Sequence, residues 1–151
     1  MSAEEPSNQK DIVKHLELIQ AVIARMANHS FLLKGWTVTL AAALIALAAK
    51  ESSRTYAIVA LGPALVFWGL DAYYLRRERL FRALYDDVRA DLEVARSGVS
   101  PFSMSTVRYE NLVAAWPQTL RAATVLWLHG SVVVAVIIAI ALLFLFPQKG
   151  N

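Results

Sequence analysis

Three long apolar runs, separated by charged stretches, dominate the pattern of hydrophobic and polar positions along the chain. They cover residues 31–49, 56–75 and 122–146. The third run is the strongest, because its 25 residues carry no formal charge, and about 18 consecutive apolar residues are enough to predict a membrane-spanning helix. We therefore predict an all-α integral membrane protein with three transmembrane helices.

The first run is the weakest of the three. From Gly35 to Ala49 it holds 15 uncharged residues. These make a helix of about 22 Å, whereas the hydrocarbon core of a bilayer is roughly 30 Å thick. Including residues 31–34 restores the length, provided that the Lys34 side chain extends its ammonium group to the headgroups. The alternative is a two-span protein in which one helix of the first pair lies on the membrane surface.

The connection between the first two runs is short and polar. It covers residues 50–55, so the two helices are expected to form an antiparallel hairpin. Gly62 and Pro63 lie near the middle of the second run and predict a bend there. We expect residues 1–9 to be a disordered tail and residues 10–151 to form a single helical membrane domain.

Two further segments have the pattern of amphipathic helices outside the membrane. In residues 10–30, apolar side chains recur at spacings of 4, 3, 4 and 3, namely Ile12, Leu16, Ile19, Ile23 and Met26. This seam either packs on the rest of the chain or joins copies of it. The second segment continues directly out of the second run, with Glu78 and Arg82 placed for an i,i+4 ion pair. It begins a cytoplasmic helical region that we expect to cover residues 76–121.

Composition and charge narrow the functional class. Hydrophobic residues make up 57% of the 151 residues, above the roughly 45–50% of soluble domains. The chain has no cysteine, which excludes disulfides, thiol catalysis and cysteine-based metal sites. Its net charge of +3 is too small and too dispersed to predict nucleic-acid binding.

Basic and aromatic residues gather at those ends of the spans that would share one side of the membrane. The arginines beside the second and third spans are Arg76, Arg77, Arg79, Arg82 and Arg121. Because the opposite ends carry fewer basic residues, the positive-inside rule predicts a cytoplasmic N-terminus and a C-terminus outside. An interfacial aromatic belt is expected at the same level, made of Trp36, Trp68, Tyr73, Tyr74 and Trp127.

Lys34 and Asp71 are the candidate functional residues. Each is an ionisable residue inside an apolar run, where a charge is costly and often functional. In the predicted hairpin the two lie at similar depth near the cytoplasmic interface. Three interpretations stay open: an ion pair that holds the two helices together, a cation site or pore-lining ring in an oligomer, and a wrong assignment of their depth.

No other residues form a motif for chemistry. The three histidines, His15, His29 and His129, do not have the i,i+3 or i,i+4 spacing of a metal site, and each is expected at the surface or at the membrane interface. The chain has no phosphate-binding glycine loop, nucleophile elbow or His-Glu-x-x-His motif. We therefore expect a protein that is not an enzyme and that has no catalytic, cofactor or metal site.

The most distinctive strings of the chain are RMANHSFLLKGW (residues 25–36), FWGLDAYYLRRERLFRALYDDV (residues 67–88) and PFSM (residues 101–104). With these motifs, the chain resembles a widespread group of small, uncharacterised bacterial multi-pass membrane proteins. The resemblance covers residues 14–146 and implies a place in a bacterial inner membrane. It also implies that certain residues belong to the signature of the group, without giving them a role: Lys34, Trp36, Asp71, Tyr74, Glu78, Arg79 and Arg82. The layout is also similar to that of the RipA-type octameric membrane proteins, which implies a homo-oligomer.

These observations lead to two functional hypotheses. The first is a small self-assembling membrane protein that forms a pore or channel, such as an effector in bacterial defence or stress. The second is a non-conducting scaffold or a partner-binding subunit, whose cytoplasmic helices contact another protein. A transporter is disfavoured, because no ionisable residue lies near the bilayer centre and the chain has no inverted repeat. The expected partners are the lipid bilayer, further copies of the chain and a second protein, but no nucleic acid.

Overall fold

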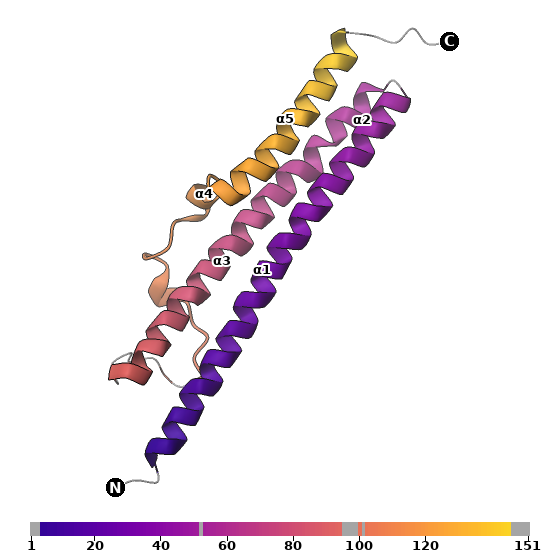
Figure 1. The fold of residues 1–151 in the computed structure, drawn as a ribbon. Coiled ribbons are helices and arrows are strands. Elements are labelled where there is room, and N and C mark those ends of the chain that lie inside the picture. The colour runs from indigo at the N-terminus through magenta and orange to yellow at the C-terminus, as the bar shows by residue number, and fades with distance from the viewer. Residues whose placement is uncertain (1–3, 52, 95–99, 101, 146–151) are drawn as a thin grey trace. The chain divides into compact units, whose positions relative to one another are not determined.

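The computed structural model describes residues 4–51, 53–94, 100 and 102–145. These residues form helices and connecting segments and contain no strand, as Figure 1 shows. The elements are α1 (Glu4–Lys50), α2 (Arg54–Val59), α3 (Leu61–Val94), the 3-10 helix η1 (Val107–Tyr109), α4 (Trp116–Thr119) and α5 (Ala123–Leu145).

Three stretches of helix are long and apolar enough to cross a membrane. They lie within Gln9–Lys50, Arg54–Ala90 and Ala123–Leu145. The predicted all-α fold with three candidate spans is confirmed by their length and composition. The chain is thus a small multi-pass helical membrane protein.

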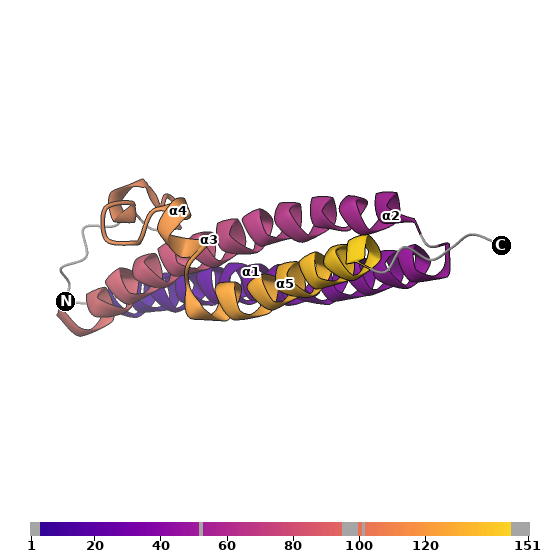
Figure 2. The same ribbon diagram turned by 90° about the horizontal axis from the view of Figure 1, so that it is seen from above.

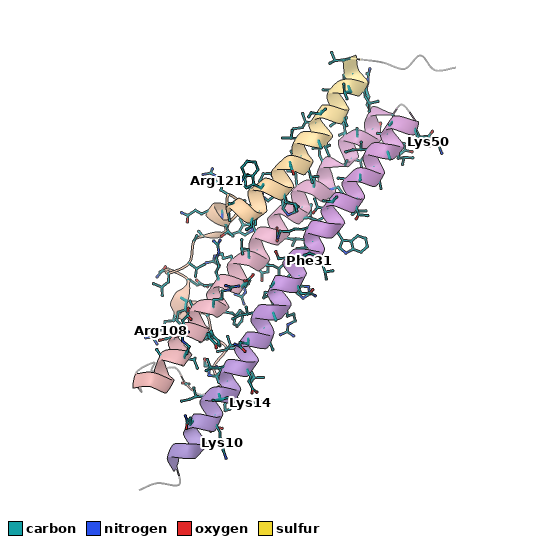
Figure 3. The ribbon with its side chains drawn as sticks, in the orientation of Figure 1. Lys10, Lys14, Phe31, Lys50, Arg108 and Arg121 are labelled. Atoms are coloured by element: carbon teal, nitrogen blue, oxygen red, sulfur yellow. The ribbon has the colours of Figure 1, made fainter. Side chains whose placement is uncertain are left out.

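α1 is one uninterrupted helix of 47 residues. It begins at Glu4, so it extends into the segment that we predicted as a disordered tail; residues 1–3 lie outside the described residues. Pro6 falls in the first turn of α1, where its missing N–H has no intrahelical partner and is tolerated. The helix ends at Lys50, and a short turn leads to α2 (Figure 3).

The predicted bend in the second run is an interruption between α2 and α3. α2 ends at Val59, and α3 begins at Leu61. Pro63 cannot donate a hydrogen bond to the carbonyl of Val59, four residues earlier, and its ring crowds that carbonyl. The helix therefore breaks one turn before the proline.

The predicted single helical membrane domain contains two compact units. The first comprises Met1–Asn28 and Tyr74–Ala115, and the second comprises His29–Tyr73 and Trp116–Asn151. We call them the amphipathic unit and the span unit. α1 and α3 each contribute residues to both units.

The amphipathic unit has a hydrophobic core between α1 and α3. Its buried residues are Leu16, Ile19, Leu80, Phe81, Leu84, Val88 and Tyr109. Ile12 and Ile23 of the predicted seam pack against this core, which confirms that the seam packs on the rest of the chain. The expected ion pair is also present, with 2.6 Å between Arg82 Nη2 and Glu78 Oε1.

The predicted cytoplasmic helical region is helical only in part. α3 extends to Val94, but within residues 102–115 only the three residues of η1 are helical. Serine and threonine are frequent here, and their side chains compete with the helix for backbone groups. Ser103 Oγ, for example, accepts a hydrogen bond from the Ser105 amide at 3.5 Å.

The span unit packs α1, α2, α3 and α5 around small side chains. Ala41, Ala60 and Val136 form its buried cluster, and the alanines allow the helix backbones to approach closely. α2 contacts α5, as the view in Figure 2 also shows. Near their ends, the guanidinium of Arg54 lies 4.3 Å from the ring centroid of Phe144.

Candidate functional site

A carboxylate with several polar partners lies inside the span unit. Asp71 of α3 and His129 of α5 both have an exposed fraction of 0%, and Ser30 of α1 is buried at 8%. The Lys34 side chain, also on α1, is 22% exposed. We call these four residues the Asp71 cluster. It joins the three span helices through one side chain.

The two carboxylate oxygens of Asp71 contact the polar groups of Lys34, Ser30 and His129. Lys34 Nζ donates to Oδ1 and lies at 2.8 Å from both oxygens. It also donates to Ser30 Oγ at 2.6 Å, and the Ser30 hydroxyl in turn donates to Oδ1. On the other side, His129 Nε2 lies 3.0 Å from Oδ2. The carboxylate is therefore both charge-compensated and hydrogen-bonded, which a buried charge requires.

His129 can donate to the Asp71 carboxylate through Nε2, which in a neutral imidazole requires the tautomer with its hydrogen on that nitrogen. Its Nδ1 is buried and has no hydrogen-bond partner among the described residues. The imidazole stacks on Trp68, with 6.4 Å between the ring centroids and 9° between the planes. The indole of Trp68 thus lies nearly parallel to the imidazole that faces Asp71.

Two tryptophan hydrogen bonds position the start of α5. Trp68 Nε1 donates to the Leu120 carbonyl at 3.0 Å, and Trp116 Nε1 donates to the Gly69 carbonyl at 3.0 Å. The second indole packs close to this position, since a Cβ built at Gly69 would lie at an ordinary contact distance of 3.5 Å from Trp116 Cζ2. These bonds attach the segment before α5 to α3 and so bring His129 to the level of Asp71.

The Asp71 cluster can hold helices together but offers no open coordination position. Asp71 is fully buried, and both of its oxygens are occupied by partners from its own chain. In this conformation the structure therefore favours the ion-pair interpretation of Lys34 and Asp71 over a pore-lining ring. Among the described residues, no group of three or more histidine, aspartate or glutamate side chains is placed to hold a metal ion.

The sequence pointed to Lys34 and Asp71 but missed Ser30 and His129. His129 was expected at the surface or interface, and it is fully buried. His15, under the same expectation, is 3% exposed and its Nε2 hydrogen-bonds the Ser103 carbonyl at 2.9 Å. The available signal for His129 was its place as the one ionisable residue of an otherwise apolar run.

The predicted aromatic belt divides into outward and inward residues. Trp36, Tyr73 and Trp127 are 57%, 48% and 79% exposed, as interfacial residues would be. Trp68 is half-buried and lies against His129. Tyr74 is half-buried as well. Phe31, which is 74% exposed on α1, is an additional outward aromatic residue (Figure 3).

The amphipathic unit has a second polar group around Asp87. Tyr109 donates its hydroxyl to Asp87 Oδ2 at 2.7 Å, and Arg108 Nη1 lies 3.6 Å from the same oxygen. Burial, and then the bond to the Asp87 carboxylate and its negative charge, raise the pKa of Tyr109 to about 12.

The expected signature residue Arg79 is half-buried on α3.

No protein-family model, curated protein or solved structure matches this chain. The resemblance to the bacterial membrane protein group therefore stays a prediction.

Proposed function

We propose that this protein is a self-assembling, non-conducting membrane scaffold with its N-terminus in the cytoplasm. In this proposal the span unit is the anchor, and the amphipathic unit contacts a second protein. The observation that carries the proposal is that Asp71 and Lys34 bind each other and their polar partners within one chain. Apart from these two residues, the outward side chains of the described parts of the spans are mostly apolar and supply no charged lining for a conduction path.

Self-assembly is supported by the outward face of α1. Its small residues are all exposed: Gly35, Thr39, Ala42, Ala43 and Ala46. Apart from its own helix turn, no atom of the described residues lies within 4 Å of a Cβ built at Gly35. Such small faces allow close helix packing in a bilayer, where van der Waals contact drives association. At most 22% of a span window is buried within the chain, which leaves ample surface for other copies.

The pore hypothesis, an effector in bacterial defence or stress, needs a different arrangement. Lys34 and Asp71 would have to exchange their present partners for a water-filled path between copies. The inward position of both residues gives this hypothesis less support than the scaffold.

Two measurements on the purified chain test the proposal. Chemical cross-linking in vesicles should show a defined oligomer, and Ala42→Leu with Ala46→Leu should weaken it. The control, Ala135→Leu with Ala141→Leu, makes the same change at exposed positions of α5 and should leave the oligomer intact. Ion flux through the same vesicles should stay at the level of protein-free vesicles. Flux that disappears in Asp71→Asn would replace the scaffold by the pore, and a monomer would refute both.

A further inference from the structure

α3 carries three arginines within four residues, directly after the apolar run of residues 56–75. We propose that Arg76, Arg77 and Arg79 bind the phosphates of anionic phospholipid headgroups. This function is separate from self-assembly and does not depend on whether the protein conducts ions.

The first argument is that these arginines are half-buried but have no counterion among the residues that the structure describes. Among the described residues, no carboxylate lies within ion-pair distance of any of the three. Two nearby arginines differ, because Arg82 lies 2.6 Å from Glu78 and Arg108 lies 3.6 Å from Asp87. A guanidinium that is partly removed from water needs an anion to compensate its charge.

The second argument is that two of the guanidinium groups are already held in place. Arg76 Nε donates to the Ala114 carbonyl at 3.3 Å, which leaves its terminal nitrogens to point elsewhere. The Cζ atom of Arg77 lies 5.7 Å from the centroid of the Phe81 ring. A planar guanidinium with a fixed orientation binds the oxygens of a phosphate with two parallel hydrogen bonds.

The third argument concerns the source of the phosphate. The three residues follow a membrane-spanning stretch in the same helix, so they lie at the end of a span, where lipid headgroups are found. Anionic lipids concentrate phosphate in this layer, and basic residues beside a span bind them electrostatically. Other arginines in the same unit, such as Arg25 and Arg89, are exposed and remain solvated.

The test measures lipid selectivity of the full chain. The purified protein is reconstituted in phosphatidylcholine vesicles with spin-labelled phosphatidylglycerol or spin-labelled phosphatidylcholine. Electron spin resonance then gives the preference for the anionic lipid at the protein surface. Arg76→Gln, Arg77→Gln and Arg79→Gln together should bring this preference close to one. A single substitution should lower it by up to roughly fivefold, the factor of one basic residue at an anionic surface.

A matched control removes the same charge elsewhere in the amphipathic unit, through Lys10→Gln, Arg25→Gln and Arg89→Gln, and should keep most of the preference. An equal loss in test and control variants would overturn the proposal, because only net charge would then matter. Replacing all three arginines by lysine keeps charge and fold and should retain an intermediate preference; no change would refute phosphate binding by the guanidinium groups. Inorganic phosphate should compete more strongly than chloride at equal ionic strength, because guanidinium groups bind phosphate oxygens with paired hydrogen bonds. Equal competition by the two anions would overturn phosphate recognition, and a native chain without preference for phosphatidylglycerol would overturn the lipid proposal.

Discussion

Replacing Asp71 by asparagine removes the charge at the centre of the span unit while it keeps the shape of the side chain. Asparagine keeps one oxygen acceptor but replaces the other by an amide nitrogen, so the three donors cannot all be satisfied and Lys34 loses its counterion. Hydrogen bonds between membrane helices contribute about 0.6 kcal/mol on average, so the loss or weakening of these three gives up to about 2 kcal/mol. Leaving one member of a fully buried ion pair without its partner costs about 3–5 kcal/mol. Because the Lys34 side chain is 22% exposed and can reach the headgroups, we expect a total of about 2–4 kcal/mol for Asp71→Asn.

A double-mutant cycle of Lys34 and Asp71 separates the interaction energy of the ion pair from general damage to the fold. Lys34→Met with Asp71→Leu removes both charges, and apolar replacements of a buried pair are often neutral. We expect the double variant to lose less stability than the two single variants together, by at least about 1 kcal/mol. Asp86→Asn, at an exposed position of α3, is the control and should change the free energy of unfolding by less than about 0.5 kcal/mol.

The assay is unfolding by dodecyl sulfate in mixed micelles, followed by circular dichroism. The reasoning is refuted if Asp71→Asn unfolds within about 0.5 kcal/mol of the native chain, the range of an ordinary surface substitution. Strict additivity of the Lys34 and Asp71 variants would also contradict it.

Two further predictions concern the tryptophan contact and the Asp87 group. Gly69→Ala should be tolerated, because its Cβ would lie at an ordinary 3.5 Å from Trp116. Gly69→Leu should displace the indole and cost about 1–3 kcal/mol, and thermal unfolding of both variants checks this. Tyr109 should ionise with a pKa of about 12, against an ordinary value of 10.0. Its neutral form therefore contributes stability that is complete below pH 10 and lost as the pH rises towards 12. In a titration followed by tyrosinate absorbance, the native chain should show one ionisation step near pH 12 that Tyr109→Phe lacks. Ionisation of Tyr109 together with the other tyrosines would disprove this prediction.

The fold was predictable from the sequence because the membrane imposes a strong constraint. Long uncharged runs identify the spans with little need for tertiary information. The seam around Leu16 and Ile19 was equally visible, since its helical spacing marks one buried face. The pattern did not decide whether that face packs on the chain itself or on another copy, because both arrangements use the same spacing.

The candidate site was only partly predictable. Lys34 and Asp71 stand out because a charge in an apolar run is unusual. His129 is separated from Asp71 by 58 positions along the chain, and its partner depends on the rotation of α5 about its axis. The hydrophobic pattern of α5 does not define that rotation, since the run is apolar on every side. Ser30 was overlooked for a similar reason, because a serine at the end of an amphipathic helix is ordinarily solvated.

The central claim is that the chain crosses the membrane three times. Its lack of cysteine allows single cysteines to report the side of each connection through a membrane-impermeant maleimide on intact cells. Three spans with the N-terminus in the cytoplasm predict that Glu51→Cys and a cysteine added after the last residue are labelled from outside, whereas Ser105→Cys reacts only after permeabilisation. Labelling of Glu51→Cys and Ser105→Cys from the same side would show that the second apolar helix does not cross the bilayer, and it would contradict the account.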